Sequence, residues 1–167
     1  MPCLDYLKIQ EIVNKVSTYK SRRMRILEAL RLLLETLTTA NGYSKDISEA
    51  SFNVNGWQTR LEGDTPVIYV VDDGTPAIER MAGRQRQYKW RVLLFGVCKG
   101  YDIVEFEEFL ADIQECVEIN GALGGIVSKT EVNNISTDSQ LFSEKEDTHL
   151  FEIELQIEYV QCHGDPR

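Results

Sequence analysis

The chain has 167 residues, of which 43% are hydrophobic and 27% are charged, so a single compact domain with an apolar core is expected and global disorder is excluded. Eighteen basic and 27 acidic residues leave a net charge of −9, which disfavours a nucleic-acid binder because phosphates would be repelled. The longest apolar run, residues 92–98, is far shorter than the roughly 20 residues of a membrane helix.

The N-terminal segment is expected to form a helical extension. Residues 4–16 are compatible with a helix, and Asp5, Lys8 and Glu11 interrupt the apolar stretch that a secretory signal would need. The protein is therefore expected to remain in the cytosol. We expect three parts: the extension at residues 1–20, the main domain at residues 21–161 and a flexible tail at residues 162–167.

Apolar residues spaced by three and four predict a core-facing helix over residues 21–40, ended by Asn41 and Gly42. Its stripe consists of Met24, Leu27, Leu30, Leu34 and Leu37. The β-branched run at residues 66–71 predicts a buried strand, and the sequence DDGTP at residues 72–76 predicts a turn that reverses the chain. Residues 87–98 predict a second strand that becomes buried on both faces.

The second half of the chain contains a helix and two strands. Asp102 and Glu105 have the spacing of a capping box, which predicts that a helix starts there. Its outer face is acidic, and its apolar stripe consists of Ile103, Phe106, Leu110, Ile113 and Val117. A short strand is expected at residues 126–135 and a polar, mobile segment at residues 133–148. Strict alternation at residues 151–159 predicts a half-buried strand.

These elements predict an α+β fold. Helices and strands occur in the order helix, strands, helix, strands, without a repeated βαβ unit. We therefore expect a mixed, mainly antiparallel β-sheet with two principal helices packed on one face, together with the N-terminal helical extension.

No catalytic, cofactor or metal site is expected. The two histidines, His149 and His163, lie in a predicted loop and in the tail, without a second ligand nearby. Asp72 and Asp73 suit a turn better than a cation site, and the glycines at residues 121–125 follow a helix instead of opening a phosphate loop. Four distant cysteines favour reduced, mostly buried thiols: Cys3, Cys98, Cys116 and Cys162.

Two charged features remain as candidate contact sites. Arg80, Arg84 and Arg86 are concentrated in a segment, residues 79–86, that is expected to be a hairpin loop. This loop is either solvated or reaches acidic groups of another subunit. Like charges in a row on the last strand must be solvated or matched by a partner or channel, and these are Glu152, Glu154 and Glu158.

The order of features over residues 23–160 resembles the tail terminator proteins of long-tailed bacteriophages, also called tail-completion or minor tail protein U-like proteins. The likeness starts with RILEAL and LTTANGY, residues 25–30 and 37–43, and continues with PVIYV at residues 66–70. It also includes the strand at residues 88–96, the helix around residues 111–113, LGGIV at residues 123–127 and the closing strand.

The resemblance implies a structural protein of the virion neck that is assembled in the host cytoplasm and is not an enzyme. Such a subunit forms a hexameric ring on the tail tube, ends tube polymerisation and offers the docking surface for the head and its connector proteins. Its partners would be other copies of itself, the tail tube protein, head-completion proteins and, in a contractile tail, the sheath protein. DNA would only pass through, and no cofactor or membrane is implied.

A physical hypothesis accompanies the resemblance. Glu152, Glu154 and Glu158 would line an acidic lumen that repels passing DNA, and the three arginines would contact a neighbouring subunit or the tube. The alternatives are a head-side neck protein, such as a stopper or head–tail joining subunit, and a small cytosolic binding domain or enzyme. The last alternative predicts a monomer or dimer with one apolar pocket.

Overall fold

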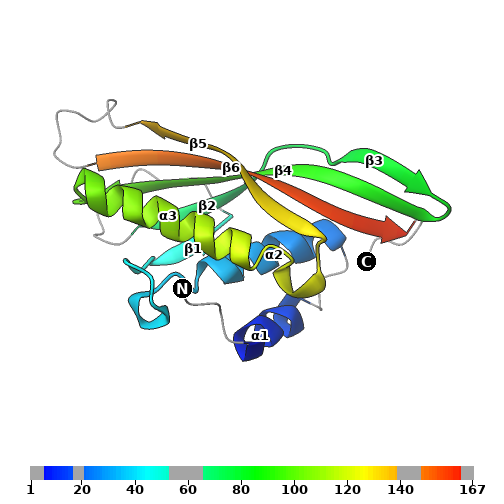
Figure 1. Cartoon of the computed structure of the whole chain (residues 1–167), viewed down its shortest axis with the longest axis horizontal. Coiled ribbons are helices and arrows are strands. Elements are labelled where there is room, and N and C mark those ends of the chain that lie inside the picture. Colours follow the sequence, from blue (N-terminus) through cyan, green and yellow to red (C-terminus); the bar gives the residue numbers. More distant parts are fainter. Residues whose placement is uncertain (1–5, 17–20, 53–65, 139–147, 163–167) are drawn as a thin grey trace.

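The structure is a computed structural model that describes residues 6–16, 21–52, 66–138 and 148–162 (Figure 1). These residues confirm the α+β class. The helices are α1 (Tyr6–Val16), α2 (Arg22–Leu34) and α3 (Ile103–Ile119), with short turns η1 (Thr39–Asn41) and η3 (Leu123–Gly125). The strands are β1 (Glu49–Ser51), β2 (Val67–Asp72), β3 (Ala77–Ala82), β4 (Gln85–Lys99), β5 (Lys129–Asp138) and β6 (Thr148–Cys162).

The sheet is mixed and mainly antiparallel, as expected. Its strand order is β1-β2-β4-β6-β5, and only the β1–β2 pair is parallel. The centre is formed by β4 and β6, which pair along their whole length from Gln85 opposite Cys162 to Lys99 opposite Thr148. In Figure 1 the two long strands run along the long axis of the molecule.

The chain does not reverse at residues 72–76, contrary to the prediction. Both β2 and β3 pair antiparallel with β4, so they run in the same direction along its edge. The segment between them only interrupts the pairing with β4. The chain reverses instead at Gly83 and Arg84. Residues 79–86, expected as a loop, are therefore the end of β3, this turn and the start of β4.

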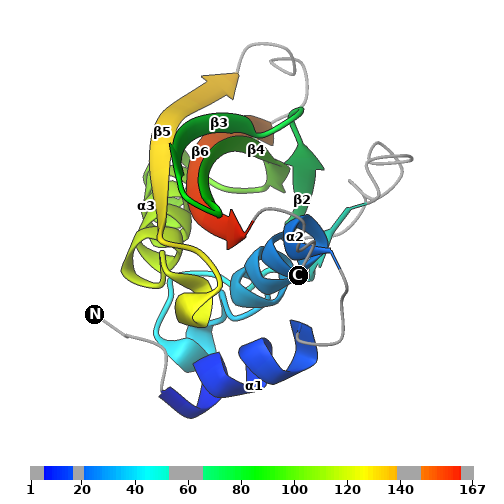
Figure 2. The same cartoon turned by 90° about the vertical axis from the view of Figure 1, so that its right-hand side faces the viewer.

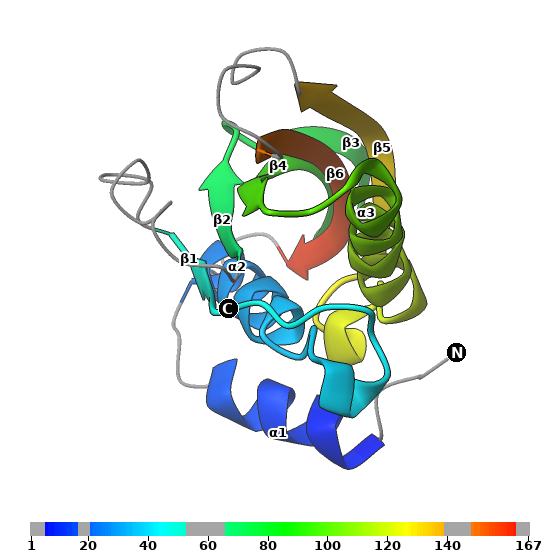
Figure 3. The same ribbon diagram turned by 90° about the vertical axis from the view of Figure 1, so that its left-hand side faces the viewer.

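The helices cover one face of the sheet, and α1 lies on the far side of α2 from the sheet (Figures 2 and 3). The core lies between α2, α3 and the alternate residues of β4 and β6. Those residues are Trp90, Val92, Leu94, Phe151, Ile153, Leu155, Ile157 and Tyr159, all at most 2% exposed. The period-two alternation predicted for the last strand is confirmed.

Two helix predictions need correction. The first main helix ends at Leu34 instead of Ala40 and is followed by turns, in which Thr36 Oγ1 donates a hydrogen bond of 2.6 Å to the carbonyl of Leu33. Leu37 is still fully buried. Met24 and Ile103, both assigned to buried stripes, are 38% and 59% exposed because they lie in the first turns of their helices, at the rim of the packed surface.

The capping box at the start of α3 is confirmed. Asp102 Oδ1 accepts a 2.8 Å hydrogen bond from the amide of Glu105, and the amide of Asp102 donates one of 3.1 Å to Glu105 Oε2. The strand expected at residues 126–135 begins at Lys129 and extends to Asp138. Residues 133–138, expected to be mobile, therefore belong to a strand that pairs with β6, and residues 139–147 lie outside the described residues.

The N-terminal extension contributes to the core. Ile12 and Val16 of α1 are 7% and 0% exposed and belong to the same hydrophobic cluster as α2 and α3. The helix rests on η3 at Gly124, where a β-carbon would lie 2.3 Å from Cγ2 of Val13. Gly124 also has a φ of +66°, which favours glycine. Part of the LGGIV segment thus forms the docking place of α1.

Candidate assembly surfaces

A three-stranded ribbon made of β3, the start of β4 and the end of β6 projects beyond the helices, as the right side of Figure 1 shows. The ribbon is held together by the pairing of Ala82 with Gln85 and of Gln85 with Cys162. Ile78 of β3 exposes 48% of its surface. The ribbon is therefore a long arm with an apolar residue on its surface.

The structure puts the three predicted arginines on this arm. Arg84 is exposed in the turn, and Arg86 is half-buried in β4 opposite Gln161. Arg80 pairs through its backbone with Gln87, and its side chain lies outside the described part. Within the described residues, neither Arg84 nor Arg86 forms an ion pair. Their charges are available to a partner.

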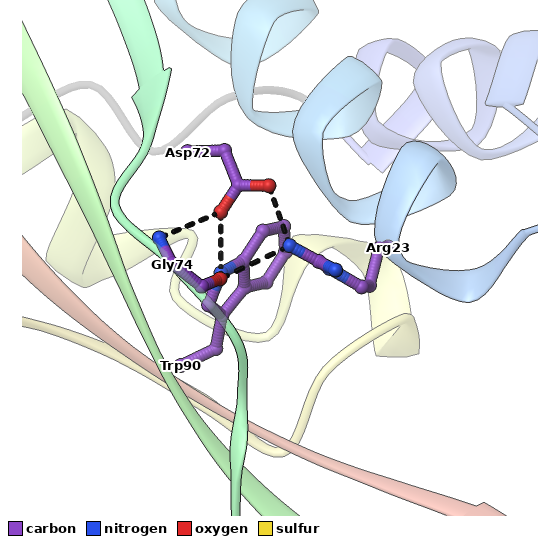
Figure 4. Close-up of polar contacts among 4 residues, drawn as sticks. All are labelled: Arg23, Asp72, Gly74 and Trp90. Carbon is purple, nitrogen blue, oxygen red and sulfur yellow. Dashed lines mark hydrogen bonds and ion pairs between the residues drawn. The ribbon is translucent and has the colours of Figure 1, made fainter.

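The base of the arm is fixed to α2 by a joint of four residues (Figure 4). Arg23 Nη2 donates to Asp72 Oδ2 at 2.5 Å and to the carbonyl of Gly74 at 3.1 Å. Trp90 Nε1 donates to Asp72 Oδ1 at 3.0 Å and to the same carbonyl at 3.1 Å. The amide of Gly74 also donates to Asp72 Oδ1, so the interruption between β2 and β3 has a defined shape.

Aromatic contacts reinforce this joint. The guanidinium of Arg23 lies 4.9 Å from the centre of the Trp90 ring, within the range of a cation–π contact. The rings of Tyr88 and Tyr159 stack at 5.1 Å next to it. A cavity of about 240 Å³ opens beside these rings, and it is lined by Ser21, Arg22, Arg23, Thr75, Pro76, Tyr88, Tyr159 and Gln161.

The second candidate surface is the sheet face that points away from the helices. Because the odd-numbered residues of β6 are buried, Glu152, Glu154 and Glu158 share the opposite face, as predicted. Two of the three are matched by cations of β4. Glu158 lies 3.8 Å from Lys89, and Glu154 lies 3.5 Å from Arg91. The row is therefore part of a charged network and not an isolated acidic stripe.

Further carboxylates from neighbouring strands join this network. Glu79 contacts Lys89 at 2.9 Å, and this hydrogen bond raises the pKa of Lys89 above its ordinary value of 10.5. Asp73 pairs with Arg91. With the Lys129–Glu131 pair, the ion-paired residues and Glu152 bring six carboxylates and three cations to this face, and the strand register adds Glu49 of β1 and Lys99 of β4. The six carboxylates are Asp73, Glu79, Glu131, Glu152, Glu154 and Glu158. The face is acidic overall.

This face also carries a cavity of about 290 Å³ at the interruption between β2 and β3, lined by Asp73, Thr75, Ala77, Lys89, Trp90, Arg91, Glu154 and Gln156. Its charged side chains already form ion pairs: Arg91 pairs with Asp73 and Glu154 of the lining, and Lys89 pairs with Glu79 and Glu158 outside it. Across the described ranges, no group of three or more His, Cys, Asp or Glu side chains is arranged to hold a metal ion.

His149 is not a solvated loop residue, contrary to the prediction. It lies in β6, its ring stacks on Phe106 at 4.5 Å, and its Nε2 lies 3.0 Å from the carbonyl oxygen of Tyr101. His163 and Cys3 lie outside the described residues. Cys98 and Cys116 are free and buried, and burial raises the pKa of Cys116 to about 11. Cys162 is exposed at the end of the arm.

Sequence comparison does not assign the chain to a family. No protein-family model matches it, and a search of curated proteins returns no significant match. No helix in the described part of the chain has both the length and the apolar character needed to cross a membrane.

Two parts of these surfaces differ from what the sequence predicts. Asp72 lies in a segment typical of a turn, but it also connects Arg23 of α2, 49 positions away, to Trp90, 18 positions away. Ile103 is predicted to lie in the core, whereas Ile103 and Val104 are exposed beside Glu107 and Glu108. The exposure of Ile103 could have been inferred from the capping box, because Asp102 as the cap makes Ile103 the first residue of the helix.

Proposed function

We propose that this protein is a structural assembly protein of a tailed bacteriophage that forms a ring on the head-proximal end of the tail tube. The ring would stop tube polymerisation and provide the docking surface for the head and its connector proteins. The observation that carries the proposal is the rigidly anchored arm with Arg84 and Arg86 at its end, in a protein of net charge −9. Such an arm suits contact between acidic subunits.

The order of elements supports the same proposal. The segments that resemble tail terminators form α2 and its exit, β2, β4, α3, η3 and β6. These segments make up the core of one α+β domain, and their distinctive residues have structural roles. In this proposal the protein acts by shape and surface charge in the virion and not by catalysis.

The acidic sheet face is the proposed lining of the ring. Glu152, Glu154 and Glu158 would face passing DNA, and an excess of carboxylates over cations would repel phosphates within about 8 Å at physiological salt. The pairs with Lys89 and Arg91 would keep the side chains ordered while the face stays negative. DNA would slide through without being bound.

The proposal is tested by the absolute mass of the purified protein, alone and after mixing with tail tube protein, measured by light scattering with negative-stain imaging. Rings, or tubes closed at one end, are expected. Binding to a portal or adaptor protein instead of the tube would favour the head-side neck alternative. A protein that binds neither partner and stays monomeric with both would contradict the proposal.

The arm has its own test within this proposal. The triple variant Arg80→Ala, Arg84→Ala and Arg86→Ala should stay folded but form fewer rings or cap fewer tubes, because the arm loses its charges. A variant that forms rings and caps tubes as the unchanged protein does at physiological salt would show that the arginines have no part in assembly.

A further inference from the structure

The outer face of α3 carries a patch at its first two turns. Ile103 and Val104 expose 59% and 61% of their surfaces, and Glu107 and Glu108, one turn later, are exposed beside them. In the described structure, neither Glu107 nor Glu108 forms an ion pair. These four residues are called the acidic α3 patch.

The acidic α3 patch is not explained by the needs of the helix. The start of α3 is already satisfied by the capping box of Asp102 and Glu105. Two adjacent β-branched residues on a solvent-facing helix surface have unfavourable helix propensity and leave apolar area in water. Two carboxylates without ion-pair partners among the described residues lie next to that apolar area. Together they form a surface that is complementary to an apolar side chain flanked by cations.

The arm carries that complement on the stretch from its turn back to Ile78, which pairs with Tyr88 near the base of the arm. Ile78 is 48% exposed, Arg84 is exposed in the turn, and Arg86 lies on the same face of the ribbon as Ile78. These three residues are called the arm tip. One apolar side chain and two cations on the arm tip match two apolar side chains and two carboxylates on the acidic α3 patch.

The two surfaces lie at opposite ends of the molecule and cannot satisfy each other within one chain. The arm tip lies around the start of β4, and three residues separate the end of β4, which has 15 residues, from the first residue of α3. A strand of that length spans roughly 45 Å. Figure 1 shows the arm at the right and the first turn of α3 at the left.

We propose that the arm tip of one copy docks on the acidic α3 patch of a second copy, so that subunits associate head to tail. Contact between two different surfaces of the same chain is heterologous, and it is the type of contact from which a closed ring is built. The inference rests on the proposed function in that it names the two surfaces through which the ring would form.

Charge reversal tests the pairing directly. The arm variant carries Arg84→Glu and Arg86→Glu, and the patch variant carries Glu107→Lys and Glu108→Lys. Each variant alone should associate about tenfold or more weakly than the unchanged protein at low salt, because attraction becomes repulsion. The quadruple variant should recover association, since the charges are complementary again. Glu118→Lys at the other end of α3 and Lys15→Glu on α1 each reverse one charge away from both surfaces, and these controls should change association little.

The measurements are sedimentation velocity across a concentration series and circular dichroism to verify that each variant is folded. We expect the unchanged protein to form assemblies larger than dimers. These assemblies should be lost in both double variants and recovered in the quadruple variant. A monomer at all concentrations, a dimer that does not grow, or assemblies indifferent to the four substitutions would overturn the inference. Capping of tail tubes is measured separately: normal capping by the double variants overturns only the assigned surfaces, whereas head-to-tail assemblies that never cap tubes overturn only the proposed function.

Discussion

The ring of Phe151 lies directly over the backbone of Gly96, its cross-strand neighbour in the centre of the sheet. A β-carbon at position 96 would lie 2.4 Å from Cζ of Phe151 and 3.1 Å from the carbonyl oxygen of Val67. Phe151 is 1% exposed and also packs edge to face on Phe109 of α3, with ring centres 6.0 Å apart. The absence of a side chain at position 96 is therefore what lets α3 pack on the sheet.

This contact predicts that Gly96→Ala lowers the free energy of unfolding by about 1–3 kcal/mol, the usual range for overpacking. Urea denaturation followed by circular dichroism measures it. The double variant Gly96→Ala/Phe151→Leu should lose less unfolding free energy than the two single variants lose together, because leucine removes the clash between the ring at position 151 and the new β-carbon at position 96. Additive effects would show that Phe151 is not the obstacle.

The docking of α1 predicts a difference between adjacent glycines. Gly124 and Gly125 both have positive φ, so alanine is strained at either position, but a β-carbon at Gly124 also meets Val13 and Ile9, whereas the space at Gly125 is open. Gly124→Ala should therefore cost about 1–3 kcal/mol more than Gly125→Ala. It should also speed hydrogen exchange in α1.

Equal costs for the two alanine variants, with α1 exchange unchanged, would contradict the docking. The double variant Gly124→Ala/Val13→Ala provides a further control. It should recover part of the stability lost in Gly124→Ala, because the nearest obstructing methyl group, Cγ2 of Val13, is removed.

Asp72 and Asp73 should differ in their effect on stability although they are neighbours. Asp72 accepts hydrogen bonds from the buried Trp90 and from Gly74, and it pairs with Arg23. Asp72→Ala should cost about 1–3 kcal/mol, because it leaves donors incompletely satisfied. Asp73 forms one surface pair with Arg91, so Asp73→Ala should cost about 0–1 kcal/mol. If thermal unfolding shows the same loss of stability for both alanine variants, Asp72 does not stabilise the joint between the arm and α2.

Local features of the fold were predictable from sequence, and long-range ones were not. The capping box and the alternation of β6 depend on residues within a few positions of each other, so the pattern alone shows them. The DDGTP segment has the composition of a turn, but composition does not distinguish a reversal from an interruption between two strands that share one neighbour. That distinction depends on pairing with β4, which comes later in the chain.

The candidate surfaces show the same division. The arginines and glutamates could be recognised as clusters, since their members are close in sequence. The pairing of Glu158 with Lys89, which are 69 positions apart in the sequence, depends on the register of β4 against β6. A single sequence holds no signal of that register. The row of glutamates was therefore correctly placed on one face, while its countercharges were missed.

The Lys45–Glu105 pair predicts a pH dependence. The hydrogen bond from Lys45 holds the pKa of Glu105 below its ordinary value of 4.5, with the amide of Asp102 adding to the effect. A lowered pKa means that this contribution to stability is present above pH 4.5 and is lost as the pH falls through the lower, folded-state value. Glu105→Gln keeps the capping box but should flatten this part of the acid-side profile.

The measurement is urea denaturation at a series of acidic pH values. Glu118→Gln, exposed at the other end of the same helix, is the control and should leave the profile of the unchanged protein intact. If the two variants have the same profile, the ion pair with Lys45 does not stabilise the start of α3.

The acidic sheet face predicts the response of the protein to DNA. Replacing Glu152, Glu154 and Glu158 of this face by glutamine changes the net charge from −9 to −6 and leaves Lys89 and Arg91 with fewer countercharges. Binding to duplex DNA should appear at low salt and disappear as salt is raised. The control carries the same charge change elsewhere, through Glu11→Gln, Glu35→Gln and Glu118→Gln. Fluorescence anisotropy of labelled DNA compares the two variants, and equal binding by both would show that net charge, and not this face, keeps the protein off DNA.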